Sequence, residues 1–148
     1  GLDDKTTLIT HDSVRPFVNT RIIEDNINAI SNGNACTTAV PATDTIFISR
    51  DGFKADNALR RNCCYQVQTP QSFFAIEFKK CYNELSSEQK GYVTDAMGVF
   101  LLNDYEVHLI MGRSENIKIT YQSDMYIAES IFELENNRKN KGTNPESW

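Results

Sequence analysis

The fold follows from a short stretch of the sequence, residues 6–17, which reads TTLITHDSVRPF. Residues 6–10 form a short run rich in β-branched side chains, which favours a strand. We expect this strand to end at His11 and Asp12, so that polar side chains stand at its carboxyl end. In open α/β sheets, ligands bind at the carboxyl ends of the strands. The stretch therefore predicts a strand with a binding site at its end.

A helix and a second strand are expected next. After Pro16, which breaks the chain, Asn19 or Thr20 can cap a helix that ends at Gly33. The apolar residues recur at helical spacing: Ile22, Ile23, Ile27 and Ile30. Residues 36–40 read as the next strand. A strand, a helix and a further strand are typical of a parallel sheet with crossover connections, which predicts an α/β fold.

Residues 42–61 depart from that alternation. Residues 45–49 are followed by the turn sequence Arg50-Asp51-Gly52 and then by residues 53–55, which indicates a β-hairpin. The hairpin has few apolar side chains to bury, and an isolated hairpin is marginal in water. We therefore expect this arm to pack against something else, and a partner subunit is the simplest candidate.

Helices and strands are expected to alternate through the rest of the chain. The helices are predicted through residues 75–82, in a turn capped by Ser86, after Thr94-Asp95, and from a cap at Ser123 to Leu134. The strands are predicted at residues 107–111 and 117–120. Residues 1–135 are then one domain. Residues 136–148 are rich in Asn, Lys and Gly without an apolar period, which predicts a solvated tail or a linker.

Composition narrows the class of protein. A chain of 148 residues with 40% hydrophobic residues can bury the core of one domain. A net charge of −5 argues against a nucleic-acid surface. No apolar run approaches the roughly 18–20 residues of a membrane span. The four cysteines lack metal-ligand spacing, so we expect free thiols in a reducing cytoplasm: Cys36, Cys63, Cys64 and Cys81.

Several short islands occur in a fixed order along the chain. They are HDSVRPF (11–17), DT (44–45), Arg61, QTPQSF (68–73), TD (94–95) and NIKIT (116–120). Together they resemble the cytidylyltransferases that join CTP to a polyol phosphate, releasing pyrophosphate. The resemblance extends from about Leu8 to Ile131. It implies a mostly parallel, Rossmann-like nucleotidyltransferase sheet flanked by helices, with a protruding β-hairpin arm through which two copies form a homodimer.

Members of that family begin with a glycine-rich loop and basic residues that hold the triphosphate, and nothing in this sequence matches them. The resemblance therefore implies that the chain is the acceptor-side part of the enzyme, truncated at its N-terminus. We expect it to bind CTP poorly and to be inactive alone, because a loop of that kind supplies the N–H groups that cradle phosphates. It also implies Mg²⁺ as the cofactor.

Asp12 and Arg15 are the first candidate site residues. The Asp12 carboxylate could accept hydrogen bonds from substrate hydroxyls or bind Mg²⁺, or it could simply stabilise a turn. Arg15 suits either a phosphate or a surface ion pair. The resemblance places Asp12 in the active site, as a substrate and metal ligand, and Arg15 near the acceptor. His11 is expected to be structural, since it has no paired base or ligand set.

The remaining candidates take their roles from the resemblance. Adjacent arginines such as Arg60-Arg61 are usually solvated, and a lysine within an alternating strand faces solvent by default. The resemblance instead implies that Arg61 extends from the arm into the active site of the other subunit and binds the acceptor phosphate there. Thr45 would contact the same phosphate, and Thr69 and Thr94 would face the acceptor. Lys118 would position the acceptor phosphate for attack.

Two acceptors compete within the family. One branch uses ribitol 5-phosphate for wall teichoic acid or capsule polymers, and the other uses methylerythritol 4-phosphate for isoprenoid precursors. The first and fourth islands look more like the ribitol branch, because the isoprenoid branch usually has Ala-Ala where this chain has Ser13-Val14. A non-catalytic dimerisation or regulatory module, and a nucleotidyltransferase for another nucleotide or sugar phosphate, are the other hypotheses.

Overall fold

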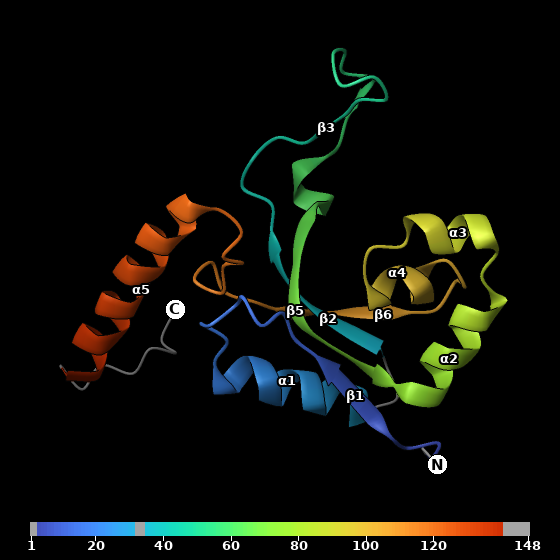
Figure 1. The fold of residues 1–148 in the computed structure, drawn as a ribbon, viewed down its shortest axis with the longest axis horizontal. Helices are drawn as coiled ribbons and strands as arrows, with labels where there is room; N and C mark the ends of the chain where they lie inside the picture. Colours follow the sequence, from blue (N-terminus) through green and yellow to red (C-terminus); the bar gives the residue numbers. More distant parts are fainter. Residues whose placement is uncertain (1–2, 32–34, 141–148) are drawn as a thin grey trace.

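A central sheet lies between helices, and a hairpin projects from it, in the computed structural model, which describes residues 3–31 and 35–140 (Figure 1). The strands are β1 (Thr7–Thr10), β2 (Ala35–Pro41), β3 (Phe47–Ile48), β4 (Asn57–Ala58), β5 (Tyr65–Phe74) and β6 (Val107–Met111). The helices are α1 (Thr20–Ser31), α2 (Ala75–Glu84), α3 (Ser87–Tyr92), α4 (Ala96–Leu101) and α5 (Gln122–Asn140), together with a short 3-10 turn, η1 (Arg61–Cys63).

The central sheet has the strand order β1-β5-β2-β6. β2 and β6 pair in parallel, but β5 runs antiparallel to both β1 and β2. The α/β fold with a helix-flanked sheet is confirmed: β1, β2 and β6 run in one direction, and β5 alone runs against them. The reason is the connection: the chain between β2 and β5 carries the hairpin arm and not a crossover helix, so it returns in the opposite direction.

β5, one of the two central strands of the sheet, was not predicted from the sequence. β5 contains Pro70, which cannot donate a ladder hydrogen bond and normally argues against a central strand. The pairing of β2 with β5 is irregular between Thr37 and Ala39, which places a bulge opposite the proline. There the Thr38 hydroxyl donates to the Pro70 carbonyl at 2.8 Å. The irregularity lets a proline-containing segment stay within the sheet.

Helices cover both faces of the sheet. On one face, buried Asn26 of α1 donates to Thr38 of β2 at 3.1 Å and accepts from Ser72 of β5 at 3.1 Å. On the other face, Gln71 of β5 donates to Asp95, the residue that caps α4, at 2.8 Å. Successive strand residues point to opposite faces, so β2 is buried on both sides. The apolar core is formed by Ile30, Ala35, Phe73, Cys81, Leu85, Met97, Val99 and Phe100.

Most of the predicted helix starts are confirmed. The Asn19 side chain accepts from the Ile22 backbone N–H at 3.0 Å, and Ser86 and Gln89 form a capping box. The predicted cap at Ser123 is wrong: α5 begins at Gln122, and Asp124 accepts from the backbone N–H groups of Thr120 and Tyr121. The predicted helix end at Gly33 lies outside the described residues.

Two expectations for the last third of the chain are wrong. Residues 117–120 form no strand, because no neighbouring strand pairs with them; instead the Ile119 N–H donates to the Val14 carbonyl at 2.9 Å. Helix α5 continues to Asn140, beyond the point where a tail was expected to begin. Polar residues did not stop the helix, since a helix tolerates them on the faces that turn away from the core.

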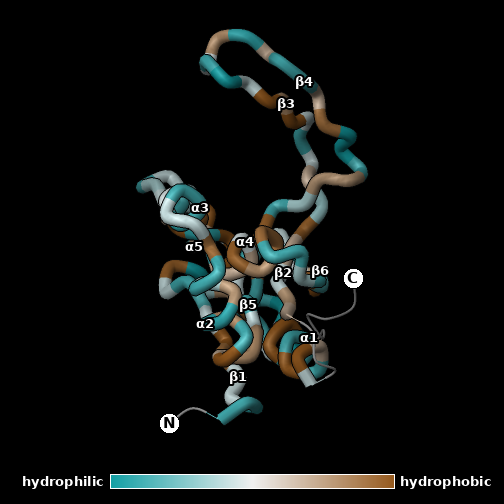
Figure 2. Tube along the Cα trace, turned by 90° about the vertical axis from the view of Figure 1, so that its right-hand side faces the viewer, coloured by the Kyte–Doolittle hydropathy of each residue, from teal (hydrophilic) through white to brown (hydrophobic). Residues whose placement is uncertain are grey.

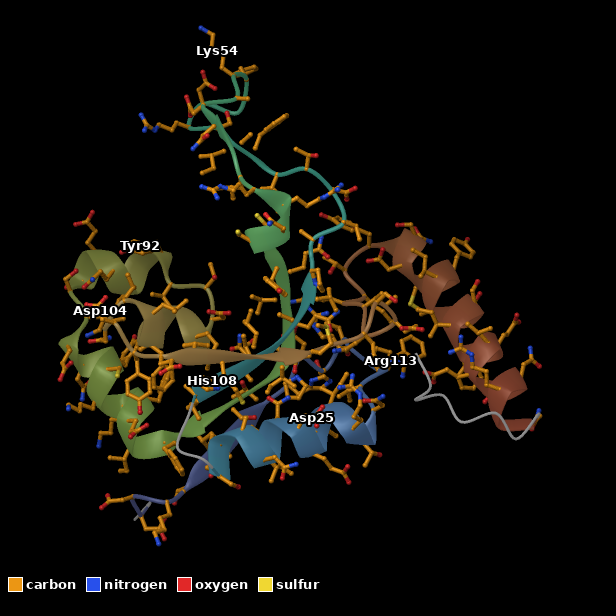
Figure 3. All side chains as sticks on the ribbon, turned by 180° about the vertical axis from the view of Figure 1, so that it is seen from behind. Asp25, Lys54, Tyr92, Asp104, His108 and Arg113 are labelled. Atoms are coloured by element: carbon orange, nitrogen blue, oxygen red, sulfur yellow. The ribbon has the colours of Figure 1, made fainter. Side chains whose placement is uncertain are left out.

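The hairpin arm is confirmed as a projection from the domain (Figure 2). Its strands β3 and β4 have two residues each, and the β4 strand lies later than predicted. Apart from Ile46, every residue from 43 to 61 is exposed, and Phe53 is 95% exposed. Lys54, labelled in Figure 3, stands at the tip. The arm is therefore exposed along its length in the part of the chain that the structure describes, and its packing against a partner subunit stays a prediction.

All four cysteines are free thiols: Cys36, Cys63, Cys64 and Cys81. Burial raises the pKa of the Cys36 thiol to about 11, which makes it a poor nucleophile at neutral pH. Within residues 3–31 and 35–140, no helix combines the length and the apolar character needed to cross a bilayer.

Candidate active site

A cleft of about 540 Å³ opens at the carboxyl end of β1. Its walls come from four segments that are far apart in the sequence: the loop after β1, the middle of β5, the start of α4, and the loop that carries Lys118. The residues that line it are Thr10, His11, Asp12, Arg15, Val67, Gln68, Thr69, Gln71, Thr94, Asp95, Ala96 and Lys118. The position agrees with the expected binding site at the end of the first strand.

The floor of the cleft holds a carboxylate between two cations. The Asp12 Oδ2 atom lies 3.1 Å from Arg15 Nε and 3.3 Å from Lys118 Nζ. The Arg15 side chain is 11% exposed and is also held by the Asn116 carbonyl at 2.7 Å, whereas Lys118 is 50% exposed. Arg15 is therefore fixed by its partners, while Lys118 keeps donors that face solvent, since an ammonium group has three.

Ion pairing determines the charge of Asp12. Burial raises the pKa of the Asp12 carboxyl, but hydrogen bonds and charges from Arg15 and Lys118 outweigh burial and hold the pKa below its ordinary value of 3.8. The group is therefore a carboxylate at neutral pH. Its role is to hold two cations in place.

The Asp12 pKa leads to a pH-dependent stability prediction. Because folding lowers this pKa, the carboxylate stabilises the protein above about pH 4 and loses that contribution as pH falls through the folded-state value. We expect Asp12→Asn to reduce the free energy of unfolding by about 1–2 kcal/mol at pH 7. Urea denaturation of both proteins from pH 7 to pH 3 measures this difference. A difference that stays constant to pH 3 would contradict the assignment.

Behind the cleft, two buried amide side chains join β5 to the loop that carries Lys118. Asn116 donates to the Gln68 Oε1 atom at 3.1 Å and to the Thr69 carbonyl at 2.9 Å. Gln68 in turn donates to the carbonyl of Arg113 at 2.9 Å. Arg113, labelled in Figure 3 between the sheet and α5, forms an ion pair with Glu135 at 3.3 Å. These bonds fix the loop relative to the sheet, and with it the position of Lys118.

Gly112 makes room for this amide pair. A Cβ atom added there would contact the Gln68 side chain and would lie 3.0 Å from Thr38 Cγ2. We expect Gly112→Ala to destabilise the protein by about 1–3 kcal/mol through overpacking. Gly91, in α3, has nothing within 4 Å of such a Cβ, so Gly91→Ala should be neutral or stabilising by about 0.5–1 kcal/mol. Thermal denaturation of the two variants tests this contrast, and equal melting temperatures would refute it.

The structure brings together five of the seven predicted site residues. Those that line the cleft are Asp12, Arg15, Thr69, Thr94 and Lys118. The two arm residues, Thr45 and Arg61, lie outside it; Arg61 donates to the carbonyl of Thr43 at 3.4 Å. Their roles at a partner's site stay predictions. Sequence reasoning gave no role to Gln68, Gln71, Asp95 or Asn116, and placed His11 among structural residues.

Magnesium was expected at Asp12. The described residues contain no group of three His, Cys, Asp or Glu side chains that could hold a metal ion. The Asp12 Oδ2 atom already contacts two cations, which is a poor setting for a third. Mg²⁺ usually takes one or two carboxylates together with substrate phosphates. These residues therefore do not fit a magnesium site formed by this part of the protein alone.

A mixed, helix-flanked sheet with a polar cleft at its strand ends and a projecting hairpin is the arrangement of an α/β protein that binds a ligand at the strand ends. The comparison of sequences makes the assignment specific. The chain belongs to the 2-C-methyl-D-erythritol 4-phosphate cytidylyltransferase family, whose model matches residues 2–134.

Individual relatives agree with this assignment. The chain is 41% identical, over 133 residues, to ribitol-5-phosphate cytidylyltransferase of Lactiplantibacillus plantarum, covering 90% of this chain and 57% of that protein. It resembles the structure of 4-diphosphocytidyl-2C-methyl-D-erythritol synthase from Anaerococcus prevotii, with 31% identity, a TM-score of 0.73, and coverage of 86% and 58% of the two chains. The Francisella tularensis 2-C-methyl-D-erythritol 4-phosphate cytidylyltransferase shares the fold, with a TM-score of 0.77 at 23% identity over 86% of this chain and 60% of that one. The chain thus spans a little over half the length of these relatives.

Proposed function

We propose that this chain is the acceptor-binding part of a cytidylyltransferase that converts CTP and D-ribitol 5-phosphate into CDP-ribitol and pyrophosphate. The observation that carries the proposal is the convergence of Arg15 and Lys118 on Asp12 in a cleft that also presents threonine hydroxyls. Such a cleft matches the two ends of a polyol phosphate, one anionic and one rich in hydroxyl groups. The 41% identity to a ribitol-5-phosphate cytidylyltransferase supports the choice of acceptor.

In the proposed reaction, a phosphate oxygen of the acceptor attacks the α-phosphorus of CTP. A new P–O bond forms, the bond between the α- and β-phosphates breaks, and pyrophosphate leaves with the electron pair. Such transfers depend on positioning and on stabilising charge, because the protein forms no covalent bond. Lys118 would hold the attacking phosphate with the donors that Asp12 does not occupy, and Arg15 would keep Asp12 in place.

The arm supplies the second part of the proposal. Thr45 and Arg61 lie on an exposed projection and outside the cleft of their own subunit. We infer a homodimer in which each arm brings these residues to the partner's acceptor phosphate. A closed two-fold dimer would give two equivalent sites.

We infer that turnover needs a polypeptide that also carries a glycine-rich phosphate loop for the nucleotide. The chain covers 57% of the length of the ribitol-5-phosphate cytidylyltransferase of Lactiplantibacillus plantarum, which supports the need for a longer polypeptide. Mg²⁺ would then enter with the triphosphate rather than at a site formed by these residues. We place the reaction in the cytoplasm, where free thiols persist, and in the supply of wall teichoic acid or capsule polymers.

The second candidate acceptor is 2-C-methyl-D-erythritol 4-phosphate, the substrate of isoprenoid synthesis. The family model and the similar solved structures favour it, since they are named for that compound. The sequence difference at Ser13-Val14 weighs against it.

Pyrophosphate release distinguishes these proposals. The chain joined to a nucleotide-binding segment from a relative would be incubated with CTP and Mg²⁺ and with each acceptor in turn. Turnover with ribitol 5-phosphate alone supports the proposal, and turnover with the methylerythritol compound alone moves the protein to the other branch. If a folded dimer releases pyrophosphate with neither acceptor, the hypothesis of a non-catalytic dimerisation or regulatory module is favoured.

A further inference from the structure

A closed ring of hydrogen bonds joins the loop after β1 to β5. The backbone N–H of Asp12 donates to the Thr69 hydroxyl oxygen at 3.0 Å, and that oxygen lies 2.9 Å from His11 Nδ1. The other ring nitrogen, His11 Nε2, lies 3.0 Å from the Arg15 carbonyl oxygen. The Arg15 backbone N–H then donates to the Asp12 carbonyl at 3.0 Å. The ring contains three site residues assigned above, Asp12, Arg15 and Thr69, and is closed by His11.

The chemistry of the partners fixes the direction of each bond. A carbonyl oxygen only accepts, so His11 Nε2 must carry the proton that it donates to Arg15. In the neutral imidazole, Nδ1 is then an acceptor, and the hydrogen of the Thr69 hydroxyl points to it. The network thus assigns the Nε2–H tautomer to His11.

This direction limits what Thr69 can offer a ligand. A hydroxyl group has one donor and two acceptor positions. The donor is used by His11 Nδ1, and one acceptor position is used by the Asp12 N–H. Thr69 and His11 both line the cleft, so the position left to Thr69 is an acceptor only.

We propose that His11 is a positioning residue, which turns the Thr69 hydroxyl so that it accepts a hydrogen bond from a hydroxyl group of the polyol. The inference rests on the proposed function. An acceptor lone pair repels a phosphate oxygen, so Thr69 marks the polyol end of the cleft, while Lys118 and Arg15 mark the phosphate end. The two ends orient the acceptor, so that its phosphate and not a hydroxyl group faces the α-phosphorus of CTP.

The tautomer can be measured without any substrate. The chain contains two histidines, so a long-range ¹H–¹⁵N spectrum of ¹⁵N-histidine-labelled protein contains two ring systems. At about pH 8.5 we expect the neutral ring of His11 to show a protonated Nε2 and an unprotonated Nδ1. His11→Leu assigns the signals. A protonated Nδ1 on neutral His11 overturns the inference and leaves the proposed function standing.

Binding tests what Thr69 recognises. Calorimetry would compare ribitol 5-phosphate with inorganic phosphate, which shares the anionic end and lacks the carbon chain. We expect Thr69→Val to lower the affinity for ribitol 5-phosphate by ~3- to 10-fold, because one hydrogen bond is lost, and to leave the affinity for inorganic phosphate nearly unchanged. Thr69→Ser, which keeps the hydroxyl, should bind both as before. An equal loss for the two ligands would place Thr69 at the phosphate and overturn the proposal.

The positioning role of His11 has its own readout. In His11→Leu the Thr69 hydroxyl is free to donate, so the preference for ribitol 5-phosphate over inorganic phosphate should fall ~3-fold or more. His11→Asn, whose Oδ1 can replace Nδ1 as acceptor, should restore it. His108→Leu is the matched control, because His108 lies on β6 and pairs with Glu106 outside the cleft (Figure 3). An unchanged preference in folded His11→Leu overturns the positioning role of His11.

If ribitol 5-phosphate binds no better than inorganic phosphate while the His11 tautomer is as assigned, the proposed function fails. The recognition of a polyol hydroxyl group by Thr69 then fails with it.

Discussion

In the chain joined to a nucleotide-binding segment from a relative, exchanging Lys118 for methionine is expected to lower kcat for the proposed cytidylyl transfer by ~10²- to 10³-fold, the usual effect of removing one group that stabilises charge in the transition state. Lys118 holds its ammonium group 3.3 Å from Asp12 while the side chain remains half exposed, so it can contact a bound phosphate without leaving its partner. Methionine keeps the length of the side chain and removes the charge. Because Lys118 is not part of the core, the fold should be retained.

The matched control for this variant is Lys90→Met. Lys90 lies 4.9 Å from the ring of Tyr82 and is not among the residues that line the cleft. It should keep wild-type kcat, and circular dichroism should show the same helix content for both variants. A Lys118→Met protein that is folded and turns over within a factor of about 3 of wild type would remove Lys118 from the proposed mechanism.

Mixing two inactive proteins is expected to restore activity. If Arg61 acts in the partner's cleft, the Arg61→Ala and Lys118→Met homodimers each lack one component at every site. A mixed dimer then has one site with both residues intact. Random exchange of subunits makes half of the dimers mixed, and each mixed dimer has one intact site out of two. The activity should therefore rise from below ~1% of the wild-type activity to about a quarter of it. The exposed arm, on which the Arg61 side chain donates to the Thr43 carbonyl at 3.4 Å, motivates this test.

Arg60 provides the control for the arm, since it adjoins Arg61 and is likewise exposed. Arg60→Ala should remain active as a homodimer and should complement Lys118→Met as wild type does. Native mass spectrometry would confirm that mixed dimers form. Mixed dimers without recovered activity would show that Arg61 and Lys118 do not act across the interface.

Local signals predicted most of the secondary structure. Caps at Asn19, Ser86 and Asp95 each start a helix where the sequence placed it, because a side chain that satisfies free N–H groups is a local property. β5 was missed because its polar residues and Pro70 resemble a loop, and only the irregular pairing with β2 accommodates them. Residues 117–120 read as a strand by alternation, but a strand also needs a neighbour, which no local pattern reveals.

The cleft was predictable where residues stand at strand ends, as Asp12 and Arg15 do. Lys118 was placed by resemblance, and the structure shows why it points to Asp12: the buried amides Asn116 and Gln68 hold its loop against β5. Bonds between residues nearly 50 positions apart leave no periodic signal in the sequence. The Asn116 Oδ1 atom is buried without a hydrogen-bond partner, and we have no physical account of it.

The most direct test of the central claim is a crystal structure of the chain with ribitol 5-phosphate. We expect the phosphate to lie within hydrogen-bond distance of Lys118 Nζ and the polyol to extend toward Thr69 in the same cleft. A polyol phosphate bound elsewhere, or bound in the cleft with its phosphate away from Lys118, would refute the proposed acceptor site.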